Sequence, residues 1–126
     1  MPDQRTAIRP LIPTEKEATT EAERFQNETL RPILKMQNDL LVAIFHNGMA
    51  KRKILFDGLS RQKQEQQIDH SLSKDNRLRF LLVGTVIGQF TPEEYERFLA
   101  MEAEATRRIM SMMAERLKSG LVKFPE

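Results

Sequence analysis

Apolar residues recur every three or four positions along most of the chain after residue 20, which is the spacing of one helix face. The most regular stripe lies near the C-terminus and contains Tyr95, Phe98, Leu99, Ala105, Ile109, Met112, Met113 and Leu117. Thr91 is a good N-cap before it, Pro92 suits the first helical position, and Glu94 stands where a capping box needs a carboxylate. No glycine or proline follows until Gly120. The pattern predicts one helix over residues 92–118.

A second long stripe covers residues 29–57 and predicts another helix that ends at Asp57 and Gly58. Its apolar positions are Ile33, Leu34, Leu40, Leu41, Ile44 and Phe45, and the phase continues through Leu55 and Leu59. Asn47 and Gly48 interrupt the stripe, and glycine inside a helix costs about 1 kcal/mol relative to alanine. A long packed helix can absorb that cost, so we favour a continuous helix. A break at Asn47-Gly48 is the alternative.

A second capping-box pattern precedes this stripe in the chain. Thr20 precedes Glu23 by three residues, which predicts that a helix begins near Glu21. Pro32 then falls inside the helical pattern, where it lacks an N–H donor and clashes with the preceding turn. We expect Pro32 to kink the helix or restart it, with residues 29–31 as the joint.

Two shorter helices are expected between the long ones. Ser60 is a good N-cap for a mostly polar helix over residues 61–72, and Ser73 can cap a helix over residues 74–89. The second half of that helix, residues 80–88, is apolar on every face, which predicts burial inside the domain or at a subunit interface. Gly84 and Gly88 are four positions apart, a spacing that lets two helix backbones approach closely. The predicted interface residues are therefore Gly84, Ile87 and Gly88.

These elements predict an all-α fold, a compact bundle of four to five helices in a single domain. Residues 1–20 contain three prolines and no helical period, so we expect an extended or disordered arm there. The helical domain is expected to cover residues 21–119, followed by a tail over residues 120–126. Short connections would make neighbouring helices antiparallel.

Composition excludes several classes of function. The 126 residues carry a net charge of +2 from 20 basic and 18 acidic side chains of interleaved sign, so nucleic acid is not an expected partner. The absence of cysteine excludes disulfides, thiolate catalysis and cysteine-based zinc sites. The first 20 residues have no apolar core of a signal peptide, and the longest apolar run is too short to span a bilayer. We therefore expect a cytoplasmic protein without membrane contact.

The sequence offers no recognisable catalytic or metal-binding motif. A di-metal site in a helical bundle needs Glu-x-x-His pairs, but Ala43 and Gln67 stand three residues before His46 and His70, the two histidines of the chain. Nucleophile triads, phosphate-binding glycine loops and zinc-protease helices are also missing. No catalytic residue, metal ligand or cofactor is assigned.

Two polar groups are candidates for a ligand-binding cleft. Asp69 and His70 lie near the junction of two expected helices, where neighbouring charges can tune a histidine near neutral pH. Amide and charged residues at Asn27, Arg31, Asn38 and Asp39 interrupt an apolar region. A solvated helix face or ordinary capping residues are the alternative explanation for both groups.

Three stretches of the chain resemble a small family of helical bacterial proteins, some of whose members carry the automatic name glyoxalase. They read FQNETLRPILKMQNDLL at residues 25–41, IDHSLSKD at residues 68–75, and VGTVIGQFTPEEY at residues 83–95. The resemblance implies an all-helical fold and no established activity. The residues do not support glyoxalase chemistry, since glyoxalase-type folds use βαβββ modules with metal ligands on strands.

The leading functional hypothesis is a non-catalytic helical protein that acts through association, as a homodimer, because an all-round apolar helix needs a covering surface. A protein or enzyme that binds a small molecule in a polar cleft is the alternative, with nucleic-acid binding as a third hypothesis.

Overall fold

The computed structural model describes residues 4–9 and 20–122, and every regular element in these residues is helical. The helices are α1 (Gln4–Ala7), α2 (Glu21–Phe25), α3 (Arg31–Met36), α4 (Asn38–Lys51), α5 (Arg61–Lys74), α6 (Asn76–Ile87), α7 (Pro92–Ala100) and α8 (Glu102–Val122). A π-helical segment, Gln26–Leu30, joins α2 to α3, and a 3-10 turn, Phe56–Gly58, lies between α4 and α5. The all-α class is confirmed, but four to five helices is too low a count.

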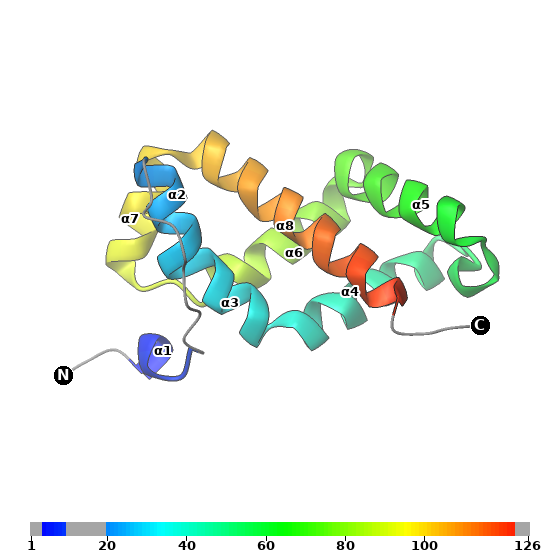
Figure 1. Cartoon of the computed structure of the whole chain (residues 1–126), viewed down its shortest axis with the longest axis horizontal. Coiled ribbons are helices and arrows are strands. Elements are labelled where there is room, and N and C mark those ends of the chain that lie inside the picture. Colours follow the sequence, from blue (N-terminus) through cyan, green and yellow to red (C-terminus); the bar gives the residue numbers. More distant parts are fainter. Residues whose placement is uncertain (1–3, 10–19, 123–126) are drawn as a thin grey trace.

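The helices are arranged around α8, which runs diagonally across the molecule (Figure 1). The path α2–α3–α4 lies on one side of α8, α5 lies on the other, and α6 passes behind and contacts α4, α5 and α8. One apolar core joins these elements. Its fully buried members include Phe25, Leu30, Ile33, Leu34, Phe45, Met49, Ile68, Leu82, Val86 and Ile109.

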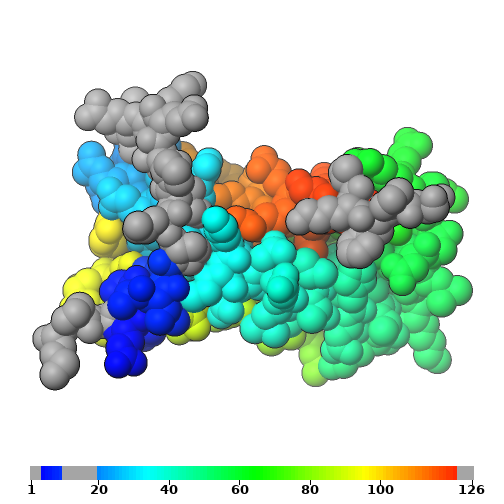
Figure 2. All heavy atoms as spheres, turned by 60° about the horizontal axis from the view of Figure 1, so that its bottom comes forward, coloured from blue at the N-terminus to red at the C-terminus, as the bar shows by residue number. Residues whose placement is uncertain are grey.

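The N-terminal arm is only partly described, and the described part differs from the expected extended chain. Gln4–Ala7 form a short helix, α1, which lies against α7 at one end of the molecule (Figure 2). Residues 10–19 of the expected arm, and residues 123–126 of the expected tail, lie outside the described residues. At the other boundary, α8 continues through Gly120 to Val122, past the predicted helix end.

Three predicted helix starts are confirmed by hydrogen bonds at the caps. The capping box of α7 is complete, because Thr91 Oγ1 accepts from the Glu94 N–H at 3.1 Å and Glu94 Oε1 accepts from the Thr91 N–H at 2.8 Å. Thr20 Oγ1 accepts from the Glu23 N–H at 3.1 Å, and Ser60 Oγ accepts from the N–H three residues later at 3.3 Å. Each bond satisfies a backbone donor that the first helical turn leaves free.

The predicted cap at Ser73 is wrong. Ser73 belongs to the last turn of α5, where its hydroxyl donates to the His70 carbonyl oxygen at 3.1 Å. Asp75 caps α6 instead, because its Oδ1 accepts from the Leu78 N–H at 3.1 Å. A carboxylate at this position also interacts favourably with the positive end of the helix dipole.

The long helix predicted over residues 29–57 is divided into α3 and α4. The break lies at Gln37, whose backbone angles of φ −94° and ψ 6° leave the helical region. The chain remains helical through Asn47 and Gly48, as favoured, and α4 ends at Lys51 rather than at residue 57. Lys53 then takes a φ of 59°, a left-handed conformation that stops the helix.

Gly48 has a packing role that explains its place inside α4. A Cβ built on Gly48 would lie only 3.1 Å from Leu78 Cδ1, so the glycine allows α4 and α6 to approach closely. This close approach of two helices at a glycine was not predicted, since the sequence pointed to Gly84 and Gly88 instead.

Pro32 is accommodated by the π-helical segment that precedes it. The Arg31 N–H donates to the Gln26 carbonyl oxygen, five residues back, instead of to the residue four back. Short π segments often appear where a helix absorbs an irregularity, here next to a residue that lacks its own N–H. The predicted joint at residues 29–31 thus belongs to a slightly earlier and longer segment, Gln26–Leu30.

The stripe predicted as one helix over residues 92–118 is also divided. Met101 breaks it, with φ −141° and ψ 39°, into α7 and α8. Phe98, Ala105, Ile109, Met113 and Leu117 are buried as expected, whereas Tyr95 and Leu99 are exposed.

We expect Ile109→Ala to lower the free energy of unfolding by about 2–5 kcal/mol, because Ile109 is 0% exposed and its truncation leaves a cavity in the core. Urea unfolding followed by circular dichroism measures the change. Leu99→Ala is the matched control on the same predicted stripe, and it should cost less than about 1 kcal/mol because Leu99 is exposed. Equal losses in the two variants would contradict the assignment of the core.

Candidate functional site

Helix α6 buries only one of its faces. Leu78, Leu82 and Val86 are at most 4% exposed and pack into the core, whereas Phe80 and Leu81 are 77% and 55% exposed. Burial of residues 80–88 inside the domain, the first of the two predicted alternatives, is therefore wrong, whereas burial at a subunit interface stays a prediction. Helices α4, α5 and α8 contact α6, and Phe80 and Leu81 lie outside the side that these helices cover.

The glycine pair lies on the uncovered side of α6. A Cβ built on Gly84 would meet no atom within 4 Å, and one built on Gly88 would meet only backbone of its own helix, the Gly84 oxygen at 3.2 Å being nearest. Ile87 beside them is half-buried. Within the described residues no helix packs on this pair, so the interface predicted at Gly84, Ile87 and Gly88 has no partner inside the chain. We call the surface of Phe80, Leu81, Gly84, Ile87 and Gly88 the outer face of α6.

The six residues predicted for a polar cleft lie in separate places. Arg31, Asn38 and Asp39 line a groove between α3–α4 and α8. Asp69 lies on the α5 side of α8, where its Oδ1 is 2.8 Å from Lys118 Nζ. His70 is exposed on α5, and Asn27 is half-buried in the π-helical segment. The six do not form one cleft, because α8 runs between the α3–α4 side and α5 (Figure 1).

The groove that holds three of these residues has a volume of about 710 Å³. Figure 2 shows α3 and α4 along this side of the molecule with α8 beside them. Arg116 of α8 lines the groove opposite Asn38, and its Nη1 donates to Asn38 Oδ1 at a long 3.4 Å. Burial lowers the pKa of Arg116, and the nearby positive charge of Arg31 lowers it further.

Sequence reasoning missed two cations of this groove, Lys35 and Arg116. Lys35 had a local signal, because Arg31, Lys35 and Asn38 recur at the spacing of one helix face. Arg116 had none, since it is 78 residues from Asn38 in the chain.

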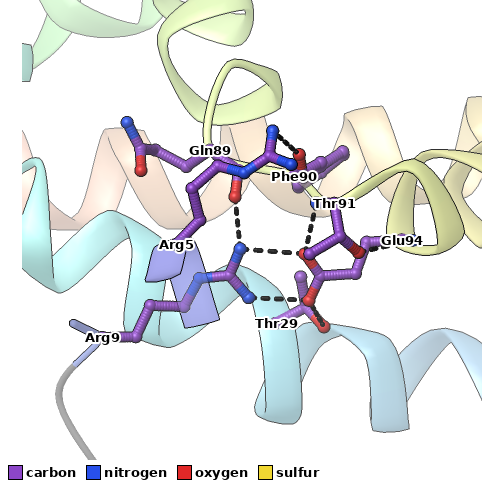
Figure 3. Close-up of polar contacts among 7 residues, drawn as sticks. All are labelled: Arg5, Arg9, Thr29, Gln89, Phe90, Thr91 and Glu94. Atoms are coloured by element: carbon purple, nitrogen blue, oxygen red, sulfur yellow. Dashed lines mark hydrogen bonds and ion pairs between the residues drawn. The ribbon is translucent and has the colours of Figure 1, made fainter. Parts of the chain in front are cut away.

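A buried ion-pair network attaches α1 to the start of α7 (Figure 3). Arg9 Nη1 and Nη2 bind Glu94 Oε2 and Oε1 at 2.6 and 2.8 Å, and Arg9 also donates to the Gln89 carbonyl oxygen. Arg5 donates to the Phe90 carbonyl oxygen at 2.8 Å. The side chains of Arg9 and Glu94 are only 6% and 13% exposed. This network holds the N-terminal helix on the turn between α6 and α7.

Glu94 remains ionised in this environment. Burial raises the pKa of Glu94, but hydrogen bonds from Arg9, from the Thr91 N–H and from Thr29, together with the charge of Arg9, outweigh it. The net effect is a pKa below the ordinary value of 4.5. The sequence suggested only the helix cap at Glu94, because the partner Arg9 lies 85 residues away.

Basic groups that are separate in the sequence meet at the N-terminus of α6. Lys51, Lys74 and Arg77 line a hollow of about 460 Å³ together with Arg52, which forms an ion pair of 3.6 Å with Asp75. The absence of a nucleic-acid partner stays a prediction.

The described part of the chain contains no group of three or more histidine, aspartate and glutamate residues that could hold a metal ion. None of its helices combines the length and hydrophobicity needed to cross a bilayer.

Comparison with known proteins gives no relative for this chain. No protein-family model matches it, and neither a curated protein nor a solved structure matches it significantly. The resemblance to a small helical bacterial family therefore stays a prediction.

Proposed function

We propose that this protein is a non-catalytic helical protein of the cytoplasm that forms a homodimer through the outer face of α6. One observation supports this most: Phe80 is 77% exposed beside a glycine whose Cβ position is open. An exposed apolar patch of this kind typically marks an interaction surface. Covering Phe80 and Leu81 would contribute about 25 cal/mol for each Å² of apolar surface removed from water.

A second copy of α6 is the partner that this face fits. In a two-fold dimer, the same patch meets itself, so it must be self-complementary. Phe80, Gly84 and Gly88 follow each other at intervals of four residues on one helix face. In an antiparallel crossing centred on Gly84, Phe80 of each copy would face Gly88 of the other. A large ring opposite a glycine gives the complementary shape that a close crossing needs.

The neighbouring helix extends the proposed interface. Ile44 of α4 and Leu81 of α6 line the same hollow, and Leu40, one turn before Ile44, is also exposed. Arg77 and Gln89 border the outer face of α6 at its two ends. An apolar centre with a polar rim is the usual composition of a protein–protein interface.

Sedimentation velocity over a wide range of protein concentrations tests the proposal. We expect a species of twice the 14.7 kDa chain mass that dissociates on dilution. A single species of 14.7 kDa, even at tens of micromolar, would rule the homodimer out.

A further inference from the structure

The groove between α3–α4 and α8 is lined by two facing rows of side chains. Arg31, Lys35 and Asn38 recur three to four positions apart along α3 and the start of α4, so they project from one side. Met112 and Arg116, four positions apart on α8, form the opposite row. These five residues include three cations.

Arg31 and Lys35 are exposed and Arg116 is half-buried, and these three cations differ from several other arginines of this protein in their partners. Arg9, Arg97 and Arg108 each bind a carboxylate at 2.9 Å or less. Within the part of the chain that the structure describes, no ion pair is formed by Arg31, Lys35 or Arg116. Against the two carboxylates that also line the groove, the three cations leave it a net charge of about +1.

Two carboxylates do line the edges of the groove. Asp39 and Glu115 are both exposed, and neither forms an ion pair with a described residue. Asp39 follows Lys35 by four positions and Glu115 follows Met112 by three, so both carboxylates border the two rows without forming an ion pair with their cations. Arg31 lies near enough to Arg116 for its positive charge to lower the pKa of Arg116. The space between these two arginines therefore favours a negative ligand.

We infer that this groove binds a small anion whose phosphate or carboxylate group is held between the guanidinium groups of Arg31 and Arg116. Lys35 adds a third positive charge, and the Asn38 amide orients Arg116 through the 3.4 Å hydrogen bond. Val42 and Met112 line the same groove and would contact an apolar part of the ligand. Guanidinium groups suit this role because their N–H donors match the oxygens of phosphate and carboxylate.

The site is independent of the proposed dimer, because the groove and the outer face of α6 share no residue. Isothermal titration calorimetry with inorganic phosphate and, separately, with succinate tests it on the full chain at constant ionic strength. We expect saturable binding of at least one probe. Binding of phosphate alone assigns a phosphate ligand, binding of succinate alone assigns a carboxylate ligand, and binding of both assigns a general oxyanion site.

Two variants test the position of the site. Arg31 is exposed, so Arg31→Gln should fold normally while weakening binding by about 10-fold or more, the loss expected for a hydrogen bond to a charged group. Arg77→Gln removes one positive charge from the hollow at α6 and should leave affinity unchanged. Absence of saturable binding of both probes, or equal weakening by the two variants, would overturn the inference. Gly84→Leu should retain anion binding even if it dissociates the dimer, so the test of the anion site can be distinguished from the test of the dimer.

Discussion

Gly84→Leu should convert the homodimer to a monomer while making the monomer more stable. The added side chain would occupy the proposed crossing point, and overpacking a close contact costs about 1–3 kcal/mol or more, so dimer affinity should fall by about 10- to 100-fold. Within one chain, a Cβ at Gly84 meets nothing within 4 Å. Leucine also favours the helix over glycine by about 1 kcal/mol. Sedimentation velocity and urea unfolding of the dilute monomer measure these two opposite effects.

Gly120→Leu is the matched control for this substitution. Gly120 also lies in a helix, α8, and a Cβ there would likewise meet nothing within 4 Å. The control adds the same apolar side chain to a different face, so dimer affinity should stay as in the wild type. Undiminished dimerisation of Gly84→Leu, or equal dissociation of both variants, would refute the proposed crossing at Gly84.

Local hydrogen bonding explains which parts of the fold could be predicted from the sequence. The caps at Thr20, Ser60 and Thr91 each involve a side chain and a backbone group three residues later, so a short stretch contains all the information. The prediction at Ser73 failed although the same rule applied. Asp75, two residues after Ser73, is an equally good N-cap. Only packing determines which of these two neighbours begins the helix.

The helix breaks depend on contacts that no local pattern records. Neither Gln37 nor Met101 is a glycine or proline, yet the backbone leaves the helical region at both. The stripes on either side of each break keep their apolar spacing, so the sequence alone favours one long helix. Packing against the rest of the core determines where such a helix bends.

The candidate sites were predicted least well because they join distant parts of the chain. Composition showed that α6 is apolar, but which of its faces is covered depends on how α4 and α8 pack against it. The proximity of Arg31 and Arg116 across the groove could be recognised only in the tertiary structure, because the two residues are far apart in the chain. The predicted residues Asp69 and His70 are polar and lie in the second half of a helix, where exposed polar side chains are common.

Glu94→Gln should lower the free energy of unfolding by about 2–4 kcal/mol, because it leaves the buried charge of Arg9 without its partner. Glutamine can still complete the capping box, so the change isolates the ion pair from the helix cap. Glu93→Gln is the matched control, since Glu93 is exposed and adjacent, and it should change stability by less than about 0.5 kcal/mol. Urea unfolding at neutral pH measures both, and equal effects would show that the Arg9–Glu94 pair adds nothing.

The stability difference between the wild type and Glu94→Gln should also depend on pH. The pKa of Glu94 is lower in the folded protein than its ordinary value of 4.5, so the unfolded chain binds the proton more readily. The stability that Glu94 contributes is therefore fully present above pH 4.5 and is lost as the pH falls through the folded pKa. Once Glu94 is protonated, it resembles glutamine, so the two unfolding curves should converge in acid. A difference that stays constant from neutral pH to well below the ordinary pKa would show that Glu94 is not held ionised by Arg9.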